Sequence, residues 1–267
     1  VVKLEQNYRS TQNVLDAANA VIRNNSSRKD KALWTDKGKG ERIRFRQFDY
    51  AADEAQFIAD DIESRRKKGH RAYGDFAVLY RTNAQSRLLE EQFIMKAVPY
   101  NVVGGTNFYS RREIKDMLAY LKTIDNGRDD IAAKRIINVP KRGIGAATID
   151  RVQEYADERR ISFFDALCEA DQIMTIGRSA SKLSPFTDMI LAFRAKLKEY
   201  GMKELIRDII ETTGYLDYLK DSSDDKDDAD ERKENVGEFV SKIVSYEETH
   251  DDPKLGEFLE EVALIAD

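Results

Sequence analysis

The spacing of apolar residues changes once along this chain of 267 residues, near Asn107 to Ser110. Before that point short apolar runs alternate with helical patterns, and beyond it only helical patterns occur. Alternating strands and helices are typical of a parallel sheet with crossover helices, whereas successive helical stripes indicate an all-helical domain. The sequence therefore predicts a helix-rich protein in which an α/β parallel-sheet portion precedes an all-α portion.

Four short segments of the first portion are predicted to be strands. The segment 76–80, FAVLY, is a continuous apolar run, as expected of a strand buried in a parallel sheet. Ser10 is positioned to cap the helix that follows it. The predicted strands are 1–5, 42–48, 76–80 and 100–103. The predicted helices follow Ser10, with Val14, Ala17, Ala18 and Val21 on one face, and span 53–68 and 84–96.

Three long apolar stripes predict helices in the second portion. Each stripe repeats at spacings of three and four residues, which places its members on one face of a helix. No convincing strand appears between Phe108 and Asp267. The stripes are Ile114, Met117, Leu118, Leu121 and Ile124; Phe186, Met189, Ile190, Phe193 and Leu197; and Val236, Phe239, Val240 and Ile243.

Composition excludes several classes of protein. A single cysteine leaves no disulfide framework and indicates a reducing, cytoplasmic compartment. His70 and His250 lie far apart and form no zinc cluster, and no apolar run reaches the length of a membrane span. The net charge of −5 argues against nucleic acid. However, the acidic run 221–234 accounts for that charge, and we expect the run to be a surface loop leading into a helix.

No self-sufficient active site is visible in the sequence. A phosphate-binding loop would read GxxxxGK[ST], and the string GKGE at 38–41 lacks that spacing. The string DEAQ at 53–56 resembles the acidic box that holds magnesium in nucleotide hydrolases. That box must end a buried strand, whereas this string opens a predicted helix, whose N-terminus its acids favour. No Ser/His/Asp arrangement is identifiable either.

The segment 136–156, IINVPKRGIGAATIDRVQEYA, has the pattern of a helix-hairpin-helix. Gly143 and Gly145 permit a tight turn that directs backbone N–H groups outward at the start of the second helix, where the helix dipole favours a phosphate. Lys141, Arg142 and Arg151 add positive charge. Such a hairpin binds duplex backbone without reading sequence. An ordinary helical corner is the alternative, and the proline, the glycines and the cations together favour DNA.

The stretch EQNYRS at 5–10 places an aromatic ring beside a guanidinium. Tyr8 offers a flat face that can stack on a base, and Arg9 offers a forked donor suited to a phosphate. Ligands bind at the ends of strands in parallel α/β sheets, which is where the pattern places both residues. A partly buried tyrosine beside a surface arginine fits the residues equally well.

Four stretches together resemble the superfamily 1A DNA helicases, the UvrD/Rep/PcrA group. They are LEQNYRST at 4–11, AVLYRTNAQSR at 77–87, VPYNVVGGTNFYSRREIKD at 98–116 and the GIG hairpin. The resemblance covers essentially the whole chain. It implies that residues 1–107 are part of the second RecA-like (2A) domain and that residues 108–267 are the helical 2B domain.

The resemblance also implies roles for individual residues. Tyr8 would pack near the adenine of ATP, and Arg9 would be an arginine finger on the γ-phosphate. Arg81 and Asn83 would face single-stranded DNA, with pairing of Arg81 to a nearby acid as the alternative. Phe108 and Tyr109 could stack on bases, but packing at a hinge is the more expected role. The hairpin candidates for duplex DNA are Lys141, Arg142, Gly143, Ile144, Gly145 and Thr148.

The activity implied is that of a motor that hydrolyses ATP with Mg²⁺, moves 3' to 5' along single-stranded DNA and separates duplex. The Walker A and B motifs are absent, as are motifs V and VI, which should follow Asp267. We therefore expect a middle piece of a helicase, inactive alone, whose ATP and Mg²⁺ are held mainly by its remaining segments. Two alternatives stay open: a non-catalytic duplex-binding module, and a helicase-like subunit of a helicase–nuclease complex.

Overall fold

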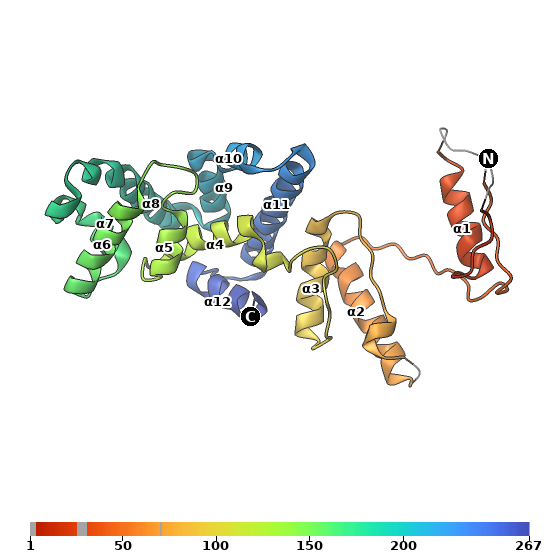
Figure 1. Ribbon diagram of the computed structural model, residues 1–267. Helices are drawn as coiled ribbons and strands as arrows, with labels where there is room; N and C mark the ends of the chain where they lie inside the picture. The colour runs from red at the N-terminus through yellow and green to blue at the C-terminus, as the bar shows by residue number, and fades with distance from the viewer. Residues whose placement is uncertain (1–3, 26–30, 70, 267) are drawn as a thin grey trace. The chain divides into compact units, whose positions relative to one another are not determined.

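The computed structural model describes residues 4–25, 31–69 and 71–266 (Figure 1). Its regular elements are helices, and no β-strand is assigned within these ranges. The chain divides into two compact units, residues 1–54 and residues 55–267. The prediction of a helix-rich protein is confirmed, and the predicted parallel sheet is not.

The described residues of the first unit include helix α1 (Gln12–Ile22) and an isolated β-bridge between Gln6 and Trp34 in parallel orientation. At this bridge Asn7 N–H donates to the carbonyl of Trp34 at 2.8 Å, and Trp34 N–H donates to the carbonyl of Glu5 at 3.0 Å. Of the strand predicted at 1–5, the first three residues lie outside the described ranges, and Leu4 and Glu5 are assigned to no strand.

The start of α1 is capped by a glycine loop. The first two N–H groups of the helix donate to the carbonyls of residues 38 and 39, at 2.9 and 3.0 Å. Gly40 has a φ of +70°, and a Cβ there would lie 2.4 Å from Thr11 Oγ1, so this loop requires glycine. The prediction of Ser10 as the cap is wrong: Thr11 is the N-cap, and its side chain makes no capping bond.

The apolar face predicted for α1 is largely open to solvent. Val14 and Val21 are 46% and 72% exposed, whereas Leu15 is the buried residue of the helix. A helix that covers a sheet buries such a face against it. Among the described residues of the first unit there is no sheet for α1 to cover.

The segments predicted as strands are extended but form no ladder. Phe45 is 86% exposed in the segment 42–48, Leu79 is 89% exposed in 76–80, and Val103 is 90% exposed in 100–103. A strand of a sheet is defined by paired N–H and C=O groups on a neighbouring strand. The described ranges provide no such neighbour, and this is why their strong apolar patterns did not become strands.

Helix α2 (Ala51–Lys67) leads into the second unit, where α3 (Ser86–Met95) follows. Both helices match their predicted ranges within three residues. They share a small hydrophobic cluster of Ala59, Ile62, Phe93 and Val98, which does not overlap with the larger core of the unit. That larger core begins at Phe108, where the apolar spacing of the sequence changes.

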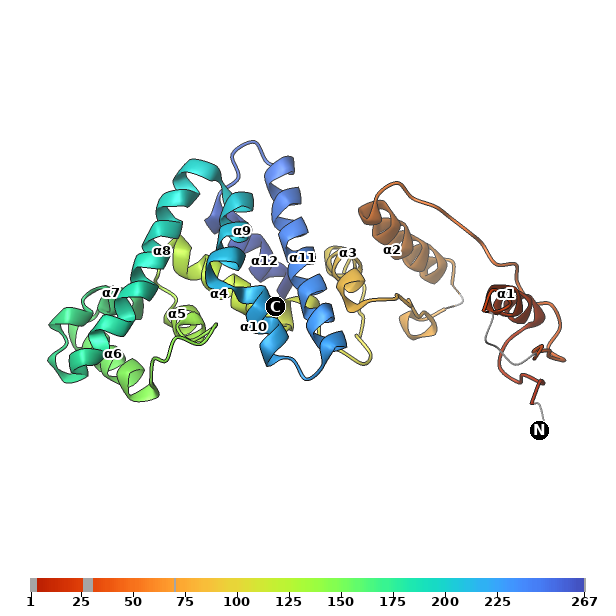
Figure 2. The ribbon, with the colours of Figure 1, turned by 90° about the horizontal axis from the view of Figure 1, so that it is seen from above.

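The larger core is formed by helices and confirms the three predicted stripes. Helix α4 contacts α5, α8, α11 and α12, and α9 lies beside α11 (Figure 2). Within the described residues no helix is both long and apolar enough to cross a bilayer. The helices are α4 (Arg112–Asp125), α5 (Asp130–Ile136), α6 (Ala146–Arg159), α7 (Phe163–Cys168), α8 (Ala180–Tyr200), α9 (Met202–Thr213), α10 (Tyr215–Ser222), α11 (Lys226–Thr249) and α12 (Leu255–Ala266).

Most of the acidic run 221–234 is helical, which corrects the prediction of a loop. Helix α11 begins at Lys226, and its N-cap Asp225 accepts a hydrogen bond from the N–H of Asp228 at 2.9 Å. Acidic residues in the first turn also complement the helix dipole. The cap and the dipole offset the low helix propensity of aspartate, so the helix starts inside the run.

Candidate nucleotide and nucleic-acid contacts

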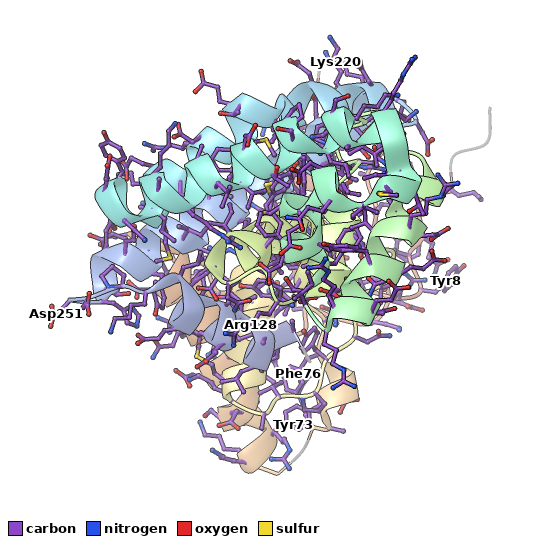
Figure 3. The ribbon with its side chains drawn as sticks, turned by 90° about the vertical axis from the view of Figure 1, so that its left-hand side faces the viewer. Tyr8, Tyr73, Phe76, Arg128, Lys220 and Asp251 are labelled. Atoms are coloured by element: carbon purple, nitrogen blue, oxygen red, sulfur yellow. The ribbon has the colours of Figure 1, made fainter. Side chains whose placement is uncertain are left out.

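A short turn after the β-bridge presents Tyr8 and Arg9. The side-chain oxygen of Asn7 accepts hydrogen bonds from the N–H groups of Arg9 and Ser10, at 3.0 and 2.8 Å. This is the self-bonding turn that asparagine favours. Tyr8, which is labelled in Figure 3, is 71% exposed, and its hydroxyl donates to Gln6 Oε1 at 2.8 Å, so most of the side chain is open to solvent.

Arg9 is anchored by its backbone and free at its side chain. Lys37 Nζ donates to the carbonyl of Arg9 at 3.1 Å. The guanidinium is exposed and has no ion pair or hydrogen bond with residues 4–25, 31–69 or 71–266. An exposed and unpaired guanidinium can bind a phosphate without first breaking an internal contact. The two residues predicted for the nucleotide site are therefore both accessible.

Arg81 and Asn83 lie in the turn that precedes α3. Gln85 Oε1 accepts from the N–H groups of Arg81 and Thr82, at 2.8 and 3.2 Å, which shapes this turn. The Arg81 guanidinium is exposed and unpaired within the described part of the chain. Asn83 differs: its Nδ2 donates to Glu231 Oε1 at 2.7 Å. The alternative in which Arg81 pairs with an acid is not seen.

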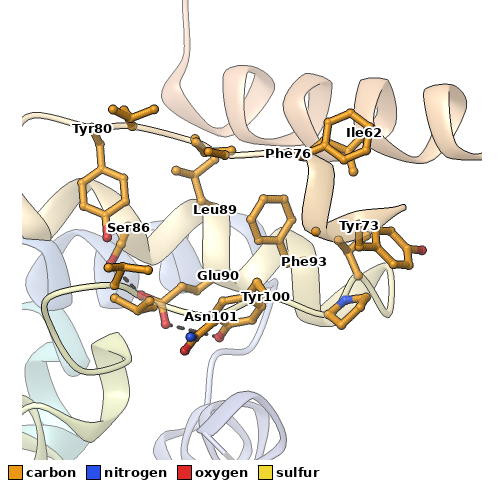
Figure 4. Close-up of a pocket in the computed structure, with 18 of the residues that line it drawn as sticks. Ile62, Tyr73, Phe76, Tyr80, Ser86, Leu89, Glu90, Phe93, Tyr100 and Asn101 are labelled. Carbon is orange, nitrogen blue, oxygen red and sulfur yellow. Dashed lines mark hydrogen bonds between the residues drawn. The ribbon is translucent and has the colours of Figure 1, made fainter. Parts of the chain in front are cut away.

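A cavity of about 920 Å³ lies between the extended segments 76–80 and 98–103 and helix α3 (Figure 4). Its lining is mainly apolar. Its carboxylate, Glu90, accepts from Ser86 Oγ at 2.6 Å, from the Tyr100 hydroxyl at 3.3 Å and from the N–H of Phe108 at 3.2 Å. Burial, followed by the nearby Glu90 charge, raises the pKa of Tyr100 to about 12. Glu90 and the groups bonded to it are thus used to hold the fold.

Phe108 and Tyr109 are packing residues. They are 0% and 6% exposed, and their rings meet edge to face at 5.2 Å. The Tyr109 hydroxyl donates to Glu91 Oε1 at 2.6 Å. Burial and the Glu91 charge raise the pKa of Tyr109 strongly. Neither ring is available to a base in this arrangement, which agrees with the expectation of packing.

The GIG hairpin connects α5 to α6 and is organised by Asn138. Asn138 Oδ1 accepts from the N–H groups of Arg142 and Ile144, at 3.3 and 3.1 Å, and Nδ2 donates to the Ile144 carbonyl at 2.5 Å. Ile144 is 6% exposed and anchors the loop in the core. Gly143 has a φ of +70°, which glycine adopts without strain. Gly145 is the N-cap of α6, with a φ of −75° that any residue can adopt.

The guanidinium of Arg142 stabilises the hairpin through hydrogen bonds on its inner side. Nη1 donates to the carbonyls of residues 136, 137 and 140 at 2.8 to 3.3 Å, and Nη2 donates to the Tyr120 hydroxyl at 2.7 Å. The same group lies over the Phe186 ring at 5.2 Å. Arg142 therefore directs its charge toward the protein and stabilises the loop conformation.

The outer side of the hairpin carries Lys141 and open backbone. Lys141 is exposed and has no ion pair within the described ranges. A Cβ at Gly143 or Gly145 would meet no heavy atom within 4 Å, so an incoming group can approach the backbone closely there. The N–H groups of residues 145–147 have no acceptor among the described residues. Free N–H groups at a helix start attract an anion.

Within the described part of the chain, no three His, Cys, Asp or Glu side chains gather as a metal site.

Sequence reasoning missed a polar seam in which Glu231, Asn235 and Glu238 of α11 contact the segment 83–113. The signal was present, since these three residues repeat at helical spacing. A polar stripe of this kind is ordinarily a solvated helix face, and only the contacts distinguish the two.

The chain belongs to the UvrD-like helicase C-terminal domain family, whose pattern matches residues 2–267. This agrees with the resemblance of the four sequence motifs to the UvrD/Rep/PcrA group.

Three relatives show which members of this family the chain is similar to. The chain is 43% identical over 267 residues to the ATP-dependent DNA helicase PcrA of Bacillus subtilis, covering 100% of this chain and 36% of that protein. It is 42% identical over 266 residues to proteins of the same name from Staphylococcus epidermidis and Staphylococcus aureus. The chain thus spans about a third of the length of these relatives and corresponds to a fragment of a PcrA-type helicase.

Proposed function

We propose that this chain is part of an ATP-dependent DNA helicase that moves 3' to 5' along single-stranded DNA and separates duplex. The observation that carries the proposal is the 43% identity to a PcrA helicase along all 267 residues. The exposed Tyr8 and Arg9 and the outward-facing hairpin support it, because each leaves a ligand-binding group free of internal partners.

In this proposal Tyr8 stacks on the adenine of ATP and Arg9 acts as the arginine finger. Their side chains fit these roles, since one offers an open ring and the other an unpaired guanidinium. ATP with Mg²⁺ would supply the phosphoryl-transfer chemistry, and segments of the helicase outside this chain would hold most of it. Arg9 would stabilise charge on the transferring phosphoryl group, a contribution worth about a thousandfold or more in rate.

Residues 1–107 are proposed as part of the second RecA-like (2A) domain and residues 108–267 as the helical 2B domain. The separate hydrophobic clusters, one over residues 59–98 and one beginning at Phe108, support this boundary. The exposed Phe45, Leu79 and Val103 support a sheet whose missing strands come from the rest of the helicase. The proposed partners are therefore the first RecA-like domain and the segment with motifs V and VI.

The hairpin is the proposed duplex contact, made by Lys141, by the backbone at Gly143 and Gly145, and by Thr148. Ile144 and Arg142 would hold the loop in shape for that contact, since one is buried and the other bonds internal carbonyls. Arg81 and Asn83 are the proposed contacts to single-stranded DNA. These contacts are directed to the DNA backbone, so binding is expected to be sensitive to salt and tolerant of sequence.

The test is ATP turnover by the complete polypeptide that carries this chain, measured with and without single-stranded DNA. Turnover that rises with single-stranded DNA, together with strand separation on a duplex with a 3' overhang, is the expected result. Full duplex affinity in the isolated chain, with no effect of single-stranded DNA on turnover in the complete polypeptide, would instead indicate a non-catalytic duplex-binding module.

A further inference from the structure

One face of α11 forms a polar seam with the segment 83–113. Asn83 Nδ2 donates to Glu231 Oε1 at 2.7 Å, Arg111 Nη1 to Asn235 Oδ1 at 2.6 Å, and Arg87 Nε to Glu238 Oε2 at 3.1 Å. The three α11 residues are spaced by four and three positions, so they lie in one row along the helix. The seam therefore fixes the position of the Glu231 side chain relative to Asn83.

The inner part of this seam is buried and fully bonded. Asn235 is 1% exposed and also donates to Glu113 Oε1 at 2.7 Å, while Arg87 is 6% exposed and also bonds Glu91 at 3.1 Å. Breaking a buried, satisfied network leaves unpaired groups and is costly. These bonds fix α11 against α3, so the first turns of α11 remain near the turn that holds Asn83.

The outer end of the seam is different, because Glu231 is exposed and has one partner. Its carboxylate accepts a hydrogen bond from Asn83 and makes no other hydrogen bond or ion pair with the described residues. The neighbouring acid Asp228 is already engaged by Arg232, at 2.9 Å. Glu231 is thus a single anion placed on the amide group that, under the function proposed above, contacts single-stranded DNA.

We propose that Glu231 is an autoinhibitory latch on the single-strand contact. Its carboxylate accepts from the Asn83 amide in place of a DNA phosphate oxygen, and DNA must displace it to reach that amide. Both groups are anions that accept the same N–H, so they exclude each other by occupancy and by repulsion. This proposal rests on the proposed role of Asn83. Its new element is that the acidic start of α11 lowers the affinity of the Asn83 site for single-stranded DNA.

The test measures the dissociation constant of a fluorescein-labelled oligo(dT) by anisotropy at low ionic strength. Glu231→Gln keeps the shape of the side chain and removes its charge. The matched control is Glu234→Gln, which removes an equal charge from an exposed acid of the same helix that has no partner among the described residues. We expect Glu231→Gln to tighten binding about three- to tenfold and the control less than about twofold, with the difference shrinking as salt rises.

Two further variants separate the latch from the DNA contact itself. In the Glu231→Gln background, Asn83→Ala should return the affinity to near the original value, because the released amide is then absent. Equal gains from Glu231→Gln and Glu234→Gln would overturn the latch and show a bulk charge effect. An Asn83→Ala change without effect in either background would overturn the proposed single-strand contact. Circular dichroism melting of each variant verifies that the fold is kept.

Discussion

Arg142 Nη2 lies 2.7 Å from the hydroxyl of Tyr120, so the most basic part of the GIG sequence is tied to the protein interior. The Tyr120 hydroxyl in turn donates to the carbonyl of Val139 at 2.5 Å, just before the hairpin turn. The hairpin is therefore held by its own arginine and meets solvent through its lysine and its backbone.

This arrangement predicts opposite behaviour for the two adjacent cations. Arg142→Ala removes donors from several partly buried carbonyls and should lower the free energy of unfolding by about 2–4 kcal/mol. Lys141→Ala removes an exposed, unpaired side chain and should change it by less than about 0.5 kcal/mol. Urea denaturation followed by circular dichroism measures both. Equal losses in the two variants would contradict the internal role of Arg142.

Lys141→Glu is expected to weaken duplex DNA binding because it places an anion beside the outward-facing N–H groups of the hairpin. Loss of one phosphate contact should also lower the slope of log affinity against log salt by about 0.9. Filter binding or anisotropy over a salt series measures both effects. Lys220→Glu is the matched control, since Lys220 is exposed on α10 and away from the hairpin in sequence. If Lys220→Glu reproduced the loss, the effect would be one of net charge.

Substitutions at the two glycines of the hairpin are expected to differ, with Gly143→Ala acting mainly on stability and Gly145→Ala mainly on duplex binding. Gly143→Ala forces a Cβ into a φ of +70° and should cost about 1–2 kcal/mol of stability. Gly145→Ala meets open space at a φ of −75°, so it should cost less stability than Gly143→Ala, with only the preference of an N-cap for glycine over alanine lost. Its added methyl group projects where the phosphate is proposed to approach, so duplex affinity should fall. A Gly145→Ala variant with full affinity would argue against backbone contact at this position.

Tyr109 is expected to make stability depend on pH in the alkaline range. Its pKa is raised from the ordinary value of 10.0, mainly by burial and then by Glu91, so the folded state favours the protonated phenol. This contribution is fully present below pH 10 and is lost as the pH rises above it, because the unfolded chain then ionises more readily. Urea denaturation across this range should show the free energy of unfolding falling, and falling less steeply in Tyr109→Phe.

Arg9→Ala in the complete helicase should reduce ATP turnover about a thousandfold while nucleotide binding largely survives. The measurement pairs a steady-state ATPase assay with binding of a fluorescent nucleotide. Lys39→Ala provides the control, because Lys39 is an exposed cation of the same unit whose backbone, not its side chain, caps α1. Turnover unchanged in Arg9→Ala would remove the arginine-finger role.

The helical part of this fold was readable from the sequence because each helix buries its own stripe. Ile114, Met117 and Leu121 recur at helical spacing and are all fully buried against neighbouring helices. The predicted sheet, by contrast, is not confirmed. Leu79 and Val103 carry a strand pattern, but a strand also needs a partner, and the described residues contain none.

The candidate site shows a similar division. The glycine turn predicted for the hairpin is seen at Gly143, which has a positive φ, but not at Gly145, whose φ is −75°. The sequence left open whether Tyr8 is exposed or partly buried, and in the structure it is 71% exposed. The direction of the Arg142 side chain could not be read from its position in the sequence, because inward and outward rotamers share the same pattern. The contact between Asn83 and Glu231 joins positions 148 residues apart, so no local signal could indicate it.

The extended segments that form no strand ladder have a consequence for the synthesis of such a protein. If residues 108–267 form the proposed 2B domain, their core, which runs from Phe108 to Val262, is expected to let them fold as soon as they leave the ribosome. The segment 76–80 emerges earlier, with Leu79 exposed and no strand ladder formed by its backbone. Until the proposed partner strands arrive, this segment is expected to be a template for pairing between nascent chains. Chaperone demand during synthesis is therefore expected to centre on these segments and not on the helices.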